Sequence, residues 1–241
     1  MRTVTTLTTR RVFWLFVPLL LIVTASCGPH GFDRPTLKRG LGAQLPPADE
    51  DIARALASRP GHRAPLKIAV YLHPEPLGSG SSRAWSWTGR DREVLLAETE
   101  RLRSDKLLAD MFVLSDLVVA NRDLKGLRVA AAQHGADALL LVAGSADVDA
   151  YSNPLSVLYI TVIGYWLFPG THRDALFLAH GAMWDVRTGS LYLTIETEAE
   201  ARTLRPGAFA NREAAIDQAK RRALDNFRDD FVRRIRRLPA G

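Results

Sequence analysis

The chain has 241 residues, 47% of them hydrophobic and 24% charged, and a formal net charge of +6 at pH 7. This length accommodates one globular domain together with a leader or a linker. Arg2, Arg10 and Arg11 supply three of the positive charges, so the rest of the chain carries a net +3. The basic cluster Lys220-Arg221-Arg222 has no interleaved aromatic residues, which argues against nucleic acid as a partner.

Residues 1–26 have the pattern of an export signal. Three arginines precede an apolar run from Val12 to Val23, and the small residues Thr24, Ala25 and Ser26 follow it. A transmembrane helix is a poorer explanation, because about 20 apolar residues are needed to cross a bilayer and this run is shorter. The pattern therefore predicts a signal peptide that is removed after export.

Cys27 is the only cysteine in the chain and follows this signal directly. The sequence from Val23 to Cys27 resembles the lipobox of bacterial lipoproteins, in which the thiol receives a diacylglyceryl group and the new amine is acylated. The usual leucine three positions before the cysteine is Thr24 here. We expect Cys27 to be the lipidated mature N-terminus, and two or three acyl chains hold a protein stably on a membrane. Gly28, rather than an aspartate, follows the cysteine, which resembles the outer-membrane sorting pattern of enteric bacteria.

Residues 27–64 are rich in proline, glycine and charge, which predicts a flexible linker. A flexible chain of this length has an end-to-end distance of roughly 35 Å. We expect the globular domain, residues 65–241, to stand clear of the lipid headgroups and to face the periplasm.

The first half of the domain alternates between strand and helix patterns. The β-branched and aromatic run from Pro65 to Glu75 predicts a buried strand. In the loop that follows, Trp85 and Trp87 are expected to pack on the sheet. The patterns predict a helix over 91–104 capped by Asp91, a strand over 111–114 that could reach 119, a helix over 123–134 ended by Gly135, and a strand over 136–148.

The second half predicts a hairpin and a long helix. Residues 177–186 and 190–201 flank a turn in which Gly189 takes the positive φ. In the second arm Leu191, Leu193 and Ile195 are expected on the buried face. Asn211 is expected to cap a helix whose apolar residues recur every three or four positions, from Ile216 to Leu238. The β-α-β-α-β-hairpin-α order predicts an α/β (α+β) fold with a single mixed sheet of about five strands and helices packed on it.

The segment 153–170 is the most apolar part of the domain. Three interpretations stay open for it: a core element under the long helix, a surface that binds a membrane or a protein partner, and a pore-forming hairpin. Under the second interpretation, the residues expected to make the contacts are Leu155, Leu158, Val162, Tyr165, Trp166 and Phe168.

This segment and the hairpin resemble a known family. The stretch from Leu158 to Gly170, followed by the hairpin sequence WDVRTGSLYL, is similar to the bacterial rhombotail lipoproteins, over roughly residues 67–238. That resemblance implies a cell-envelope lipoprotein of uncharacterised function. The order of elements is also similar to the small α/β domains of periplasmic lipoproteins, a likeness of fold that transfers no function.

Catalytic and metal-binding patterns are weak. Ser115-Asp116 and Ser145 with Asp147 and Asp149 are expected at strand ends, where sites of α/β proteins form, but none lies in a G-x-S-x-G motif. The histidines lack metal-ligand spacing, although His172, Asp174 and His180 could meet near the hairpin. No cofactor, metal or catalytic residue is expected.

The sequence therefore favours a non-enzymatic, lipid-anchored envelope protein that presents an α/β domain to a protein partner. Two alternatives stay open. One is an envelope hydrolase in which Asp147, Asp149 and a histidine share a pocket, and the other is a membrane-associated oligomer formed through residues 155–168.

Overall fold

The computed structural model describes residues 31–35, 61, 64–74, 85–152, 171–205 and 212–238. These residues fall into two packed units, and the smaller comprises 31–32, 148–152, 171–174, 202–205 and 212–215. The larger unit contains the remaining described residues. The elements in chain order are β1 (Leu66–Leu72), α4 (Gly89–Leu96), α5 (Thr99–Ser104), β2 (Leu108–Val113), η1 (Asp116–Val118), α6 (Leu124–Gln133), β3 (Ala138–Ser152), β4 (Thr171–Asp185), β5 (Leu191–Arg205) and α8 (Arg212–Ile235).

The strands form one five-stranded mixed sheet in the order β2-β1-β3-β4-β5. β1 pairs in parallel with β2 on one side and with β3 on the other. The Val186 N–H donates to the Asp137 carbonyl (2.9 Å), which puts the end of β4 beside the start of β3, so these two strands run antiparallel. β4 and β5 are neighbours joined by residues 186–190, a connection short enough only for an antiparallel pair. The predicted fold class is confirmed.

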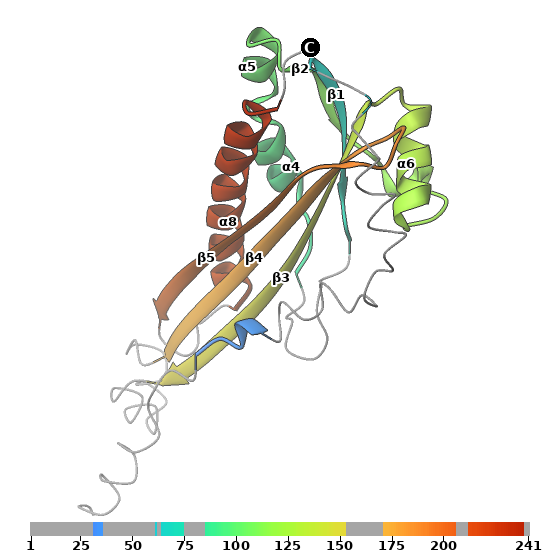
Figure 1. Cartoon of the computed structure of the whole chain (residues 1–241). Coiled ribbons are helices and arrows are strands. Elements are labelled where there is room, and N and C mark those ends of the chain that lie inside the picture. The colour runs from blue at the N-terminus through green and yellow to red at the C-terminus, as the bar shows by residue number, and fades with distance from the viewer. Residues whose placement is uncertain are drawn as a thin grey trace, which may run out of the picture. The chain divides into compact units, whose positions relative to one another are not determined.

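Helices cover both faces of the sheet in the larger unit. α4, α5 and α8 lie on one face and α6 lies on the other (Figure 1). β1 is buried on both faces because it lies between two parallel neighbours and between the helix layers, which is why its sequence is an almost continuous apolar run. On the α6 side, Leu127 and Ala131 belong to a buried cluster with Ala69, Tyr71 and Leu139.

The periodic face of the last helix packs as predicted. Ile216, Ala219, Ala223, Phe227 and Ile235 are all buried. Phe227 lies so close to Gly181 of β4 that a methyl group at Gly181 would come within 2.6 Å of the Phe227 ring. The glycine therefore makes room for the aromatic ring. Asn211, the expected cap, lies outside the described residues.

Two of the predicted boundaries were wrong for a local reason. The helix over 91–104 is interrupted at residues 97–98, so α4 and α5 are separate. Thr88 rather than Asp91 caps α4: the Thr88 hydroxyl accepts from the Asp91 N–H, and the Asp91 carboxylate accepts from the Thr88 N–H. This reciprocal capping box makes Asp91 the third residue of the helix.

Four strands also differ from the predictions. β2 begins at Leu108, three residues early, and ends before Ser115, whose side chain caps η1. The hairpin arms extend beyond the predicted ranges, and Leu191 at the start of β5 is 51% exposed, while Leu193 and Ile195 are buried as predicted. β3 continues to Ser152, because its pairing outlasts the apolar part of its sequence.

The hairpin turn is stabilised by hydrogen bonds to a carboxylate, Asp185, for which the sequence analysis predicted no role. Asp185 accepts hydrogen bonds from the Thr188 N–H (2.7 Å), the Tyr192 hydroxyl (2.9 Å) and the Gly61 N–H (2.6 Å). Burial by itself would raise the pKa of Asp185, but these donors outweigh it and hold the pKa well below the ordinary value. Gly189 has φ +75°, as predicted for this turn.

Two residues of the predicted linker contact the hairpin strands within the larger unit. Gly61 binds Asp185 of the hairpin, and Arg34 pairs with Glu198 (3.4 Å) and with Glu200, both on β5. These ion pairs are exposed, so each stabilises the docked position only weakly. The domain boundaries at residues 26 and 64 stay predictions.

Candidate functional site

A pocket lies where β1 and β2 end. It has a volume of about 380 Å³ and is open to solvent. Its lining comes from the ends of both strands, from the segment before α4 and from α4 itself, and consists of Leu72, Pro74, Ser86, Trp87, Arg92, Val113, Leu114, Ser115 and Asp116. Carboxyl ends of parallel strands are where open α/β sheets bind ligands. We take this pocket as the candidate functional site.

Trp87 forms a fixed aromatic wall of the pocket. Its indole N–H donates to the His73 carbonyl (2.7 Å), which ties the ring to the end of β1. Trp85 stands edge-on to Trp87 with ring centroids 4.6 Å apart, and also packs on Phe177 at 4.9 Å. The tryptophans thus pack onto the sheet as predicted, and Trp87 also lines the pocket.

A buried ion pair holds this wall in place. The Lys220 ammonium of α8 lies 2.9 Å from the Asp91 carboxylate and donates to the Ser86 carbonyl (2.8 Å). Both charged side chains are only 3% exposed. Because Asp91 also closes the capping box with Thr88, the segment 85–88 and the start of α4 are fixed to α8 before any ligand arrives.

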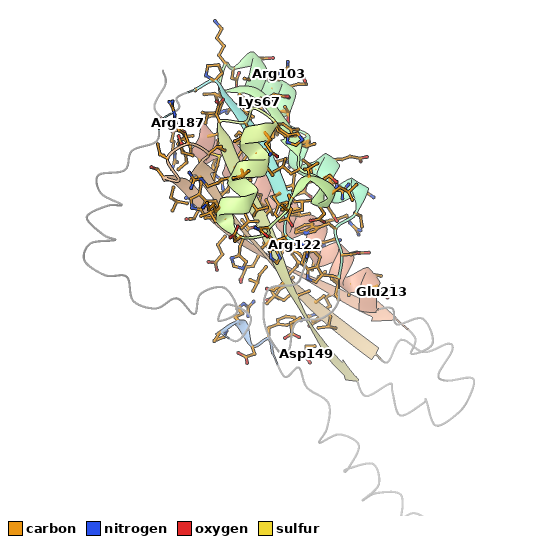
Figure 2. All side chains as sticks on the ribbon, turned by 90° about the vertical axis from the view of Figure 1, so that its right-hand side faces the viewer. Lys67, Arg103, Arg122, Asp149, Arg187 and Glu213 are labelled. Atoms are coloured by element: carbon orange, nitrogen blue, oxygen red, sulfur yellow. The ribbon has the colours of Figure 1, made fainter. Side chains whose placement is uncertain are left out.

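The aspartate of the lining is coupled to a buried tyrosine that lies outside the lining. The Tyr71 hydroxyl donates to Asp116 Oδ1 (2.8 Å), and Arg122 Nε lies 3.9 Å from the same oxygen. Burial, followed by the hydrogen bond to Asp116, raises the pKa of Tyr71 to about 12. In Figure 2, where the α6 side faces the viewer, Arg122 is labelled just before that helix begins.

Replacing Asp116 should be visible in the titration of Tyr71. We expect Asp116→Asn to shift the Tyr71 pKa from about 12 toward the ordinary value of 10.0, because the negative charge that opposes the phenolate is lost. The ultraviolet absorbance of tyrosinate against pH, with Tyr71→Phe to identify the transition, measures this. In the unaltered protein the raised pKa stabilises the fold fully below pH 10.0, and this contribution disappears as the pH rises toward 12. An unchanged Tyr71 transition in Asp116→Asn would contradict the coupling.

Exposed apolar side chains directly follow the lining residue Asp116 in the chain. The Ser115 hydroxyl accepts from the Leu117 N–H (3.3 Å), which starts the short turn η1 directly after β2. This turn presents Leu117, which is 96% exposed, and Val118, which is 41% exposed. Ser115 therefore acts as a cap, and it has no histidine among the residues that share the pocket lining.

The structure separates the other predicted acids and histidines. Ser145 and Asp147 lie inside β3 and not at a strand end, because that strand runs on to Ser152. Ser145 is fully buried, and its hydroxyl has no hydrogen-bond partner among the described residues. Asp149 accepts from the Gly31 N–H (3.0 Å). Of the serines and aspartates that were predicted at strand ends, only Ser115 and Asp116 directly follow a strand.

The suggested histidine cluster at the hairpin gains no support. Asp174 forms a two-pronged ion pair with Arg202, at 3.0 Å from both Nε and Nη2, so its carboxylate is already engaged. Within the described ranges, no group of three histidine, cysteine or acidic side chains could hold a metal ion. The side chain of His172 is not among those described.

The residues predicted for lipidation and for partner contact lie in parts of the chain that the structure does not describe. Cys27 and the segment from Leu155 to Phe168 lie outside the described residues. No helix in the described part of the chain is long and apolar enough to cross a bilayer.

Sequence reasoning missed Trp87 and Arg92 as members of one site, and Tyr71 as the buried partner of Asp116. Tyr71 reads as an ordinary core residue of an apolar strand, and Arg92 as one exposed charge of a helix. The only available signal was the Ser115-Asp116 pair after a strand. The parallel β1–β2 pairing brings these residues together, and one sequence does not reveal which strands are neighbours.

No family model and no curated protein match this sequence. Among solved structures, the chain is similar to a hypothetical protein from Chlamydia trachomatis, with 12% identity and a TM-score of 0.38 over 71% of this chain and 98% of that one. A minor lipoprotein from Acinetobacter baumannii shows 14% identity and a TM-score of 0.36 over 75% of this chain and 98% of that one. A lipoprotein from Neisseria meningitidis shows 13% identity and a TM-score of 0.31 over 71% and 98%.

Proposed function

We propose that this chain is a lipid-anchored protein of the bacterial cell envelope that presents its α/β domain to a protein partner and has no enzymatic activity. The observation that carries the proposal is the sequence Val23-Thr24-Ala25-Ser26-Cys27 after an arginine-flanked apolar run. An exported chain with a single cysteine cannot form an intramolecular disulfide. Lipidation accounts for the presence of that cysteine. Gly28 supports the outer membrane as the destination.

The surface of the domain supports a binding role. Leu117 and Val118 are exposed beside a pocket whose walls are held by hydrogen bonds and a buried ion pair. Exposed apolar side chains that adjoin a preformed pocket are typical of binding sites. The lining contains Ser86, Ser115 and Asp116 but neither histidine nor cysteine, so neither serine shares the pocket lining with the histidine base that common serine hydrolases use.

The anchor can be tested at Cys27. We expect Cys27→Ser to abolish incorporation of an alkyne fatty acid and to block removal of the signal, because the thiol is the only acceptor for the diacylglyceryl group. Metabolic labelling followed by gel analysis of the precursor and mature forms measures both effects. Ser26→Ala is the matched control and should be labelled like the unaltered chain. Labelling that persists in Cys27→Ser would refute the anchor.

The apolar segment 153–170 is the second surface that we propose for docking. Tyr165 and Trp166 are amphipathic rings suited to a half-wet interface, and Pro169-Gly170 closes the segment. We expect Val162→Asp to leave the fold intact and to abolish association with membrane or partner. A carboxylate buried in a core would instead cost several kcal/mol and unfold the domain.

Circular dichroism and liposome flotation of the unlipidated chain from Gly28 onward separate these outcomes, because without the acyl chains flotation reports only the contacts of the polypeptide. Leu191→Asp is the matched control, because Leu191 is already exposed on β5 and a charge there should change neither measurement. A Val162→Asp protein that folds normally and keeps all its contacts would eliminate both interpretations.

A further inference from the structure

Arg92 is the charge in the pocket that lacks a partner. It lies on the exposed side of α4 and lines the pocket, yet its guanidinium forms no ion pair or hydrogen bond with the described residues. The other charge in the lining, Asp116, is already engaged through Oδ1 by Tyr71 and Arg122. The pocket therefore presents a guanidinium without a partner among the described residues, and the planar N–H fork of a guanidinium matches a carboxylate.

The second carboxylate oxygen of Asp116, Oδ2, calls for a hydrogen-bond donor on the ligand. Tyr71 and Arg122 both approach Oδ1, and Oδ2 contacts no donor in the described part of the chain. A carboxylate oxygen of this kind accepts hydrogen bonds from N–H groups. A ligand that places a carboxylate on Arg92 and an N–H on Asp116 satisfies both polar groups of the lining at once.

The apolar part of the site selects the same kind of ligand. Leu72, Leu114 and Trp87 give the pocket apolar walls, and the exposed Leu117 directly follows the lining residue Asp116 in the chain. A small ion or sugar would leave Leu117 uncovered. An extended peptide covers it, because neighbouring side chains of the peptide reach Leu117 while one side chain enters the pocket.

We propose that the pocket between the ends of β1 and β2 binds an acidic residue of a partner polypeptide that is flanked by apolar residues. The carboxylate pairs with Arg92, a backbone N–H of the peptide donates to Asp116 Oδ2, and the apolar neighbours pack on Trp87 and Leu117. The inference deepens the proposed function, on which it rests, by naming the surface and the chemistry of its partner. Lys220 and Asp91 fix the wall in advance, which lowers the entropy lost on binding.

Three acetylated peptides test the proposal on the mature full-length protein in detergent micelles. They are acetyl-Leu-Glu-Leu-amide, its Gln analogue, and the Gln analogue with a free C-terminal carboxylate. The indole N–H resonance of Trp87, assigned with Trp87→Phe, reports binding at the pocket wall. We expect the Glu peptide to bind about five- to tenfold more tightly than the Gln amide, as a charge-assisted hydrogen bond provides. The third peptide shows whether a terminal carboxylate serves as well as a side chain.

Arg92→Gln is expected to abolish the preference for the Glu peptide without affecting the fold. Arg90→Gln is the matched control: it removes the same charge two residues earlier on α4, outside the pocket lining, and should keep the preference. Leu117→Ser should weaken the Glu and Gln peptides equally.

Three results would overturn the proposal. They are equal binding of the Glu and Gln peptides, a preference that survives Arg92→Gln, and no Trp87 shift up to about 10 mM peptide. None of these results would bear on the proposal that Cys27 is lipidated, because fatty-acid labelling measures lipidation separately. Loss of labelling, in turn, would leave the peptide result standing, so the two failures are distinguishable.

Discussion

Lys220→Met is expected to lower the free energy of unfolding by about 3 to 5 kcal/mol, because it leaves the Asp91 carboxylate buried without its counter-ion. The two charged atoms lie 2.9 Å apart, and both side chains are 3% exposed. The Ser86 carbonyl would lose its donor as well. Denaturant unfolding followed by circular dichroism measures the change, read as a lower midpoint at constant slope.

Two further variants show that the effect belongs to the ion pair. Arg221→Met removes a cation from the exposed side of the same helix and should change stability little. Asp91→Asn combined with Lys220→Met should recover part of the loss, since no buried charge is left unpaired. If Lys220→Met were as stable as the unaltered protein, the pair could not be what fixes the segment 85–88 and the start of α4 to α8.

Phe227→Ala is expected to destabilise the domain by about 3 to 5 kcal/mol, because truncating a buried phenylalanine removes its transfer free energy and leaves a cavity. The ring is 1% exposed and packs directly over Gly181 of β4. Gly181 itself has no side chain that could fill the space. Thermal and denaturant unfolding both measure the loss.

Gly181→Ala tests the same contact from the sheet. Its methyl group would meet the Phe227 ring, so we expect this variant to be destabilised as well. In the double variant the smaller side chain at 227 leaves room for the methyl group. The double variant should therefore be more stable than the sum of the single effects predicts. Strict additivity would show that Phe227 and Gly181 are not in contact.

The sequence by itself determined the order of the elements and the buried face of the last helix. Its apolar residues recur every three or four positions, from Ile216 to Ile235, and those positions are buried. Gly135 and Gly189 have φ of +69° and +75°, where the sequence placed a helix end and a hairpin turn. These features depend on residues close together in the chain, so local physical chemistry is sufficient to predict them. The signal and lipobox are also local patterns.

Only the tertiary structure decided where the candidate site lies. Ser115 and Asp116 could be placed after a strand, but the partners of that strand follow from long-range pairing, which a single sequence does not encode locally. That pairing brings Tyr71 to Asp116 across 45 positions of the chain, and packing of α8 brings Lys220 to Ser86 across 134. It also extended β3 past Asp147, since hydrogen bonding to a neighbouring strand continues where the apolar pattern stops. A site assembled from separate elements can be recognised only when the order of the strands in the sheet is known. For this reason the sequence did not indicate a functional role for Arg92 or Trp87.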